Sequence, residues 1–173
     1  PVVSPLFFVA QTPPAEVMAA SNLAVSLTSG AQNITLDYLS DTPRRSNMNL
    51  LSLNTSPPSV PGKVYLHFEN MTGAGQVPIF EIYLNPGTPD EPDDDRHVDS
   101  LSFFGVENSS TPSDHHNGSG MHQIIDISEM FDQLRNQPGW DSRQLQILLK
   151  PAWPMPAGAR ATIGRISLYA NHG

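Results

Sequence analysis

The sequence predicts an all-β protein: an antiparallel, jelly-roll-like β-sandwich of about eight or nine strands, with one short helix near the C-terminus. Several segments alternate apolar and polar residues with a period of two, which is typical of half-buried strands. The chain contains 17 prolines and 12 glycines, which suits short strands joined by turns. Only one segment has the apolar spacing of an amphipathic helix. Its 173 residues favour one domain.

The first part of the chain predicts a linker and then a hairpin. Residues 1–22 contain a Pro-Pro pair followed by small residues, so we assign them to an N-terminal linker and residues 23–173 to the β-sandwich domain. Residues 23–28 and 33–38 both alternate, and Ser29 and Gly30 between them indicate a turn. The segment that follows is polar and proline-rich, and it predicts one strand at 49–53.

Three alternating segments form the centre of the predicted sheet. Residues 63–70 direct Val64, Leu66 and Phe68 to one face, and residues 78–85 do the same with Phe80, Ile82 and Leu84. Residues 98–106 alternate more loosely and are expected to pair with 78–85. The loop between them is rich in proline and aspartate, which excludes a helix or a central strand. Its carboxylates lack the spacing of a dedicated calcium loop, so a solvated loop is favoured.

The last third of the chain contains the predicted helix. Residues 107–120 are polar and glycine-rich and predict a loop, and 121–126 predict a strand. Apolar residues then recur at helical spacing, while Asp126 and Glu129 have the spacing of a capping box. This stripe consists of Ile127, Met130, Phe131 and Leu134. Residues 145–149 and 161–170 predict two closing strands around a proline-braced turn at 151–158.

Composition limits the partners. The net charge of −8 disfavours binding to a phosphate backbone, so we exclude nucleic acid. No apolar run approaches the ~20 residues that span a bilayer, so no membrane partner is expected. The absence of cysteine excludes disulfides and a thiolate nucleophile and leaves both a cytoplasmic and a secreted soluble protein open. A chain that begins with Pro1 suggests a piece of a longer polypeptide or removal of the initiator methionine.

Residues that could carry chemistry are sparse. The candidates for a zinc or copper site are Asp114, His115, His116 and His122. No two of these histidines are spaced i, i+4 on a predicted helix, so the pattern favours loop residues without a native metal ion. No serine has the glycine-elbow context of a nucleophile, and no carboxylate stands alone in an apolar setting. The chain is therefore predicted to be non-catalytic.

The central residues also resemble a known family. The runs at 80–85 and 98–105 are similar to the paired signature of the C-terminal β-sandwich domain that follows the copper core in bacterial-type tyrosinases and polyphenol oxidases. Segments 125–128, 145–151 and 162–168 agree with that domain in order and spacing, and 14–21 resembles the linker that leaves the core. The likeness covers residues 14–169.

The resemblance implies a shielding role. In that family, a helical core holds binuclear copper on histidines, several of them in HxxxH spacing, and oxidises phenols with dioxygen. The C-terminal domain covers the entrance to the copper site, often with a bulky side chain, and keeps the enzyme latent. No HxxxH occurs in this chain, so no copper ligand is carried over and the copper is expected in the associated core. The candidates for the covering side chain are Trp153, Met155, Phe103 and Phe104.

Three functional hypotheses follow. The first is a non-catalytic shielding domain, which also aids folding or copper loading, whose partner is a tyrosinase-like core in the same precursor or on a separate chain. The second is an independent carbohydrate-binding or adhesion sandwich, in which Trp140 and Trp153 form the sugar platform. The third is a hydrolase or other enzyme whose site the sequence does not reveal.

Overall fold

A computed structural model describes residues 16–39, 62–88, 90–112, 118–141 and 143–171. These residues form nine strands, two α-helices and one 3-10 turn. The strands are β1 (Glu16–Ala20), β2 (Val25–Ser26), β3 (Gln32–Tyr38), β4 (Lys63–Ala74), β5 (Phe80–Leu84), β6 (His97–Leu101), β7 (Met121–Asp126), β8 (Gln144–Pro151) and β9 (Arg160–Asn171). The helical elements are η1 (Asp94–Arg96), α2 (Val106–Ser110) and α3 (Ser128–Arg135). The all-β antiparallel prediction is confirmed.

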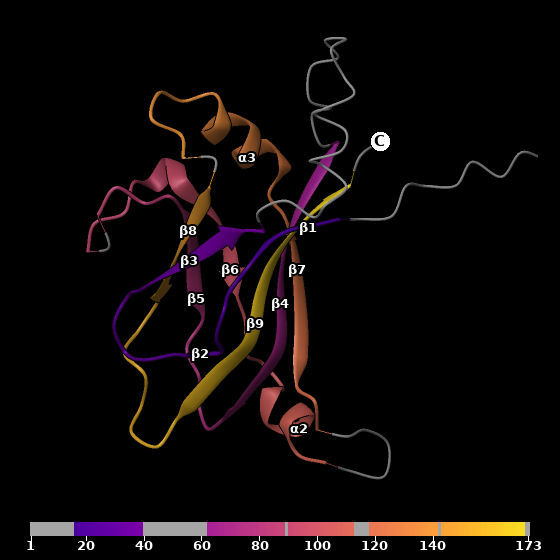
Figure 1. The fold of residues 1–173 in the computed structure, drawn as a ribbon. Coiled ribbons are helices and arrows are strands. Elements are labelled where there is room, and N and C mark those ends of the chain that lie inside the picture. Colours follow the sequence, from indigo (N-terminus) through magenta and orange to yellow (C-terminus); the bar gives the residue numbers. More distant parts are fainter. Residues whose placement is uncertain (1–15, 40–61, 89, 113–117, 142, 172–173) are drawn as a thin grey trace, which may run out of the picture.

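All nine strands belong to one sheet, with the order β6-β5-β8-β3-β1-β9-β4-β7 and β2 beside β9. Strands β3, β5, β6 and β8 lie on one side of the molecule, and β4, β7 and β9 on the other, so that the curled sheet nearly closes as a barrel (Figure 1). The sequence favoured a sandwich over a barrel. The structure has two packed layers, and they are halves of one continuous sheet.

The core lies inside the curled sheet and consists of the alternating residues that the sequence identified. Val64, Leu66 and Phe68 of β4 are buried, as are alternate residues of β5 and β8. The predicted pairing of the central segments is also found, since Phe80 lies opposite Leu101 and Glu81 opposite Ser100. Hydrophobic burial by these alternating faces is the main stabilising contribution.

Several local predictions were wrong because long-range pairing overrides local patterns. The expected hairpin of 23–28 with 33–38 is absent from the described pairings: β2 pairs with β9, while β3 pairs with β8 and β1. Residues 16–20, which the sequence assigned to the linker, form β1 between β3 and β9. Residues 1–15 and the strand expected at 49–53 lie outside the described residues. The assignment of one domain after a linker stays a prediction.

The helical content also exceeds the prediction of one helix. Residues 106–110, expected as loop or strand, form α2, whose serines donate their hydroxyls to backbone carbonyls four residues earlier. This helix buries only Val106, so it has no apolar stripe to detect. Asp94–Arg96 form a 3-10 turn inside the acidic loop that was expected to exclude helix. Helices α3 and α2 lie at opposite ends of the sheet (Figure 1).

Candidate functional site

The predicted covering residues gather at the end of the sheet that carries α2. Strand β5 pairs with both β6 and β8, with Phe80 opposite Leu101 and Pro151. The segments that follow β6 and β8 therefore emerge on either side of the segment that precedes β5. The N–H of Ala152 donates to the carbonyl of Ile79 at 2.9 Å, which holds two of these segments together. Three large apolar side chains are exposed here, and we call them the apolar rim: Ile79, Phe104 and Trp153.

Phe104 is the most exposed of these side chains, with 92% of its surface accessible. It lies at the second position of a β-turn in which the Val106 N–H donates to the Phe103 carbonyl at 3.1 Å. Gly105 has φ 79° and ψ 2°, and no positive φ occurs at Phe104, so the turn is of type II. Glycine is favoured at this third position because a Cβ is disfavoured at positive φ.

The turn is anchored in the core on both sides of Phe104. Phe103 is 4% exposed and packs edge-on against Phe80, with ring centroids 6.0 Å apart. Val106 is buried as well. Because its neighbours are fixed, Phe104 is held away from the core at the tip of a defined turn. Phe103 itself is a core residue and does not project.

The other two candidates differ in exposure. Trp153 is 48% exposed on the loop between β8 and β9. Met155 is partly buried against the core, and its carbonyl accepts a hydrogen bond from the Ser29 hydroxyl at 3.4 Å. Ile79, which was not among the predicted candidates, joins the rim because it immediately precedes β5 and is exposed, whereas the next residue, Phe80, is buried. The available signal in the sequence was an apolar residue at a position that the alternation of Phe80, Ile82 and Leu84 assigns to the outward side.

The two tryptophans of the hypothetical sugar platform are separated. Trp140 precedes β8 and packs edge-on against Phe131 of α3, with ring centroids 5.6 Å apart. Trp153 follows β8, and an eight-residue strand separates its ends by more than about 20 Å. The two rings therefore do not form one platform, which removes the observation that motivated that hypothesis.

The metal candidates are largely outside the structure. Asp114, His115 and His116 are not among the described residues. His122 is exposed on β7, near His67 of β4. The pKa of His67 is lowered, mainly by partial burial. Within the part of the chain that the structure describes, no three His, Asp or Glu side chains converge as a metal-binding group.

A polar cluster on the outer face of β5 and β6 has the residue types of a catalytic triad but a different order. Glu81 Oε2 contacts His97 Nε2 at 2.6 Å and accepts the Ser100 hydroxyl at 2.9 Å. The carboxylate thus lies between the serine and the histidine. A serine nucleophile needs the imidazole as its direct base, so this arrangement joins two strands and does not activate Ser100.

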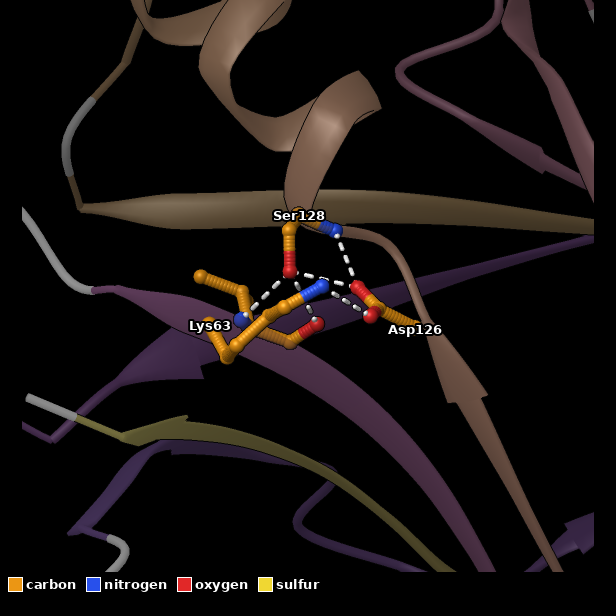
Figure 2. Close-up of polar contacts among 4 residues, drawn as sticks. Lys63, Asp126 and Ser128 are labelled. Atoms are coloured by element: carbon orange, nitrogen blue, oxygen red, sulfur yellow. Dashed lines mark hydrogen bonds and ion pairs between the residues drawn. The ribbon is translucent and has the colours of Figure 1, made fainter. Parts of the chain in front are cut away.

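A second cluster joins β4, β7 and α3 (Figure 2). Ser128 donates its N–H to Asp126 Oδ1 at 3.0 Å and its hydroxyl to the same oxygen at 2.5 Å, and the Val64 N–H donates to Ser128 Oγ at 2.9 Å. Lys63 Nζ lies 2.8 Å from Asp126 Oδ2. The hydrogen bond to Asp126 raises the pKa of Lys63. The amine therefore stays protonated and cannot act as a base toward Ser128. Helix α3 begins at Ser128, and the hydrogen bond from Val64 fixes this end of the helix to the sheet.

Beside this cluster, a groove of about 730 Å³ lies between α3 and the η1–β6 segment. Most of the charged side chains in its lining are carboxylates, and Arg96 donates to the amide oxygen of Gln137 at 2.6 Å. The acidic members are Asp93, Asp94, Asp95, Asp126 and Glu129. None of its described lining residues carries a hydroxyl or thiol nucleophile, so the groove offers an acidic surface without a nucleophile.

We expect acid to weaken the Asp126 cluster. The hydrogen bond from Lys63, and then those from Ser128, lower the pKa of Asp126 from 3.8 to about 2. A lowered folded-state pKa stabilises the fold above pH 3.8, and this stabilisation is lost as pH falls toward 2. The side chain is 43% exposed, so solvent screening limits the effect to about 1 kcal/mol or less.

The measurement is the free energy of unfolding by urea at several values between about pH 5 and about pH 2, the range in which Asp126 takes up its proton. Asp126→Asn keeps the shape and one oxygen acceptor, and its stability should fall less steeply over this window than that of the wild type. Parallel curves for the two proteins would show that Asp126 does not titrate as described.

Comparison with known proteins supplies the family. Residues 14–171 match the family described as "Domain of unknown function (DUF7868)", which is most of the chain. The chain belongs to this family. The match begins just before β1 and ends with β9, so the DUF7868 family corresponds to the whole curled sheet with both helices.

The DUF7868 chain is also similar to a tyrosinase. It is 29% identical over 108 residues to tyrosinase HcTyr1 of Hahella sp. (strain CCB-MM4). The aligned stretch covers 62% of this chain but only 23% of that tyrosinase. The similarity thus agrees with a tyrosinase-related domain and concerns a minor part of the relative. Among the described residues of this DUF7868 chain, no helix is long and apolar enough to cross a lipid bilayer.

Proposed function

We propose that this chain is the accessory domain of a tyrosinase-type copper enzyme and that it covers the entrance to the copper site of an associated core. The observation that carries this proposal is Phe104, a fully displayed aromatic side chain on a turn anchored in the core. The similarity to less than a quarter of a tyrosinase supports it, since an accessory domain is expected to match a minor part of such an enzyme.

Phe104 is the covering residue because it combines exposure with a fixed position. An exposed aromatic ring costs free energy in water, and this cost is recovered when the ring enters an apolar pocket of a partner. The backbone of the turn is anchored by Phe103 and Val106, so docking has to order the ring but not the segment that carries it. Ile79 and Trp153 extend the apolar rim and contribute the surrounding contact area. Phe103 and Met155 serve the core of this domain instead.

Binuclear copper belongs to the partner in this proposal. The sequence contains no HxxxH, and in the described ranges no three potential ligands converge. The spacing of the histidines in the sequence and the arrangement of the described residues therefore do not fit a type-3 copper centre. When bound in the core, the copper pair supplies the oxidation of phenols by dioxygen, while this chain restricts access of the phenol.

The test begins with the core. A reading frame with paired HxxxH motifs, the same as or next to that of this chain, is expected to encode it. When the chain is titrated onto the copper-loaded core, oxygen uptake with a diphenol should fall in a saturable way. A core whose activity is unchanged at excess chain would contradict the proposal. So would a purified chain that binds two copper ions and oxidises a diphenol by itself.

A further inference from the structure

The curled sheet closes through a side chain. Strands β6 and β7 are the first and last in the sheet order, and none of the described strand pairings joins them. Gln123 of β7 spans this gap, which we call the seam. Its Oε1 accepts the N–H of Ser102 at 3.2 Å, and its Nε2 donates to the carbonyl of Ser100 at 2.9 Å. The amide thus satisfies one backbone group of β6 and one of the residue that follows it, as a neighbouring strand would.

The position of Gln123 within β7 explains how it reaches β6. Residues of β7 alternate between faces, and Gln123 shares the core-facing side with buried Ile125. A hydrophobic residue would be expected there from the alternation. The polar residue is tolerated because both ends of its amide find partners, whereas an unpaired amide in this part-buried place would be costly.

The same hydrogen bonds lead to Phe104. Ser102, whose N–H is held by Gln123, accepts the N–H of Phe104 on its own hydroxyl at 3.3 Å. Gln123 therefore fixes the segment that leads into the turn, while Phe103 and Val106 fix the turn itself. Ser102 is thus the only residue between Gln123 and the backbone N–H of Phe104 in this series of hydrogen bonds.

We propose that Gln123 is a positioning residue for Phe104: by closing the seam, it sets the direction in which the ring leaves the domain. The functional part of this inference rests on the proposed function, because the direction of the ring matters only if a partner binds it. The hydrogen bonds themselves are a property of this chain alone, and they can be tested without a partner.

The first test is amide hydrogen exchange of the isolated chain. Gln123→Met keeps the length of the side chain and removes both hydrogen bonds, so the Ser102 amide should exchange roughly tenfold faster. Ser128→Ala is the matched control, since it removes a part-buried hydroxyl beyond the far end of β7 and leaves the seam intact. Unchanged protection of Ser102 in Gln123→Met, or an equal loss in Ser128→Ala, would overturn the inference.

The second test is a double-mutant cycle in the inhibition assay. Gln123→Met should weaken inhibition of the core about two- to tenfold, the usual range for losing such hydrogen bonds. In a Phe104→Ala background the same change should have little further effect, because Gln123 acts through that ring. Ser102→Ala, which removes only the acceptor for the Phe104 N–H, should weaken inhibition less than Gln123→Met does.

The outcomes separate the two proposals. If the chain does not inhibit the core at all, the proposed function fails, and the exchange experiment still decides whether Gln123 holds Ser102. If Phe104→Ala weakens inhibition while Gln123→Met does not, or if the two effects simply add, the positioning role is wrong and the proposed function stands.

Discussion

Phe104→Ala is expected to weaken the association of this chain with the proposed oxidase core about 30- to 150-fold. Burial of a phenylalanine side chain contributes about 2–3 kcal/mol, and each 1.4 kcal/mol is about tenfold in affinity. The substitution should leave the fold intact, because the ring is 92% exposed and contributes little to the core. The measurement is the inhibition constant from oxygen uptake at increasing concentrations of the variant chain.

Leu39→Ala is the matched control for this experiment. Leu39 is a large apolar residue, 56% exposed, that follows β3. The pairing of Asp37 with Gln144 puts it near the start of β8, away from the rim near Pro151. The Leu39→Ala substitution should leave the inhibition constant unchanged within about twofold. Equal weakening by both variants would indicate a general loss of surface hydrophobicity, and a large effect of Trp153→Ala alone would transfer the covering role to Trp153.

Phe80→Ala is expected to cost about 3–5 kcal/mol of unfolding free energy, the usual range for removing a buried aromatic ring. Phe80 is fully buried in β5, which lies between β6 and β8, and its ring supports Phe103. Truncation leaves a cavity beneath the turn that carries Phe104. The measurement is urea denaturation followed by circular dichroism.

The neighbouring residue provides the comparison for Phe80. Ile79→Ala changes a residue that is 37% exposed and faces outward, and it should cost less than about 1 kcal/mol. If both variants lose similar free energy, the assignment of Phe80 to the core and of the preceding Ile79 to the surface is wrong. A loss below about 1 kcal/mol for Phe80→Ala would contradict its place in the core.

The strands with strong alternation could be predicted from the sequence. In β4 and β5, the apolar residues at every second position are buried, as expected. Helix α3 was found by the spacing of Ile127, Phe131 and Leu134, all of which are buried. In these segments, the local pattern of apolar residues agrees with their burial in the structure, so the sequence was sufficient to predict them.

The weaker elements could not be predicted because their stability comes from distant partners. Strand β1 is short and alanine-rich, and it exists because β3 and β9 pair with it from either side. Helix α2 is polar and is stabilised by its own serine hydroxyls and by packing against β4. Neither leaves a periodic trace in the sequence.

The candidate site divides in the same way. The sequence pointed to Phe103 and Phe104 as a pair but did not separate them, and it placed Gly105 inside the strand predicted at 98–106, whereas β6 ends at Leu101. Backbone geometry separates the two: Gly105 at φ 79° turns the chain so that Phe103 enters the core and Phe104 leaves it. Gln123 carried no signal as a structural bridge, because its partners Ser100 and Ser102 lie more than 20 residues away, at the end of β6 and just after it.

The sequence by itself determined the all-β class, the inward faces of the central strands and the single amphipathic helix, because burial imposes its period directly on neighbouring residues. Only the tertiary structure decided that the sheet is continuous, that it closes through Gln123, and that Phe104 is displayed at its end. These features depend on which strand edges meet, and strand pairing is set by the packing of the whole core, which no local period encodes.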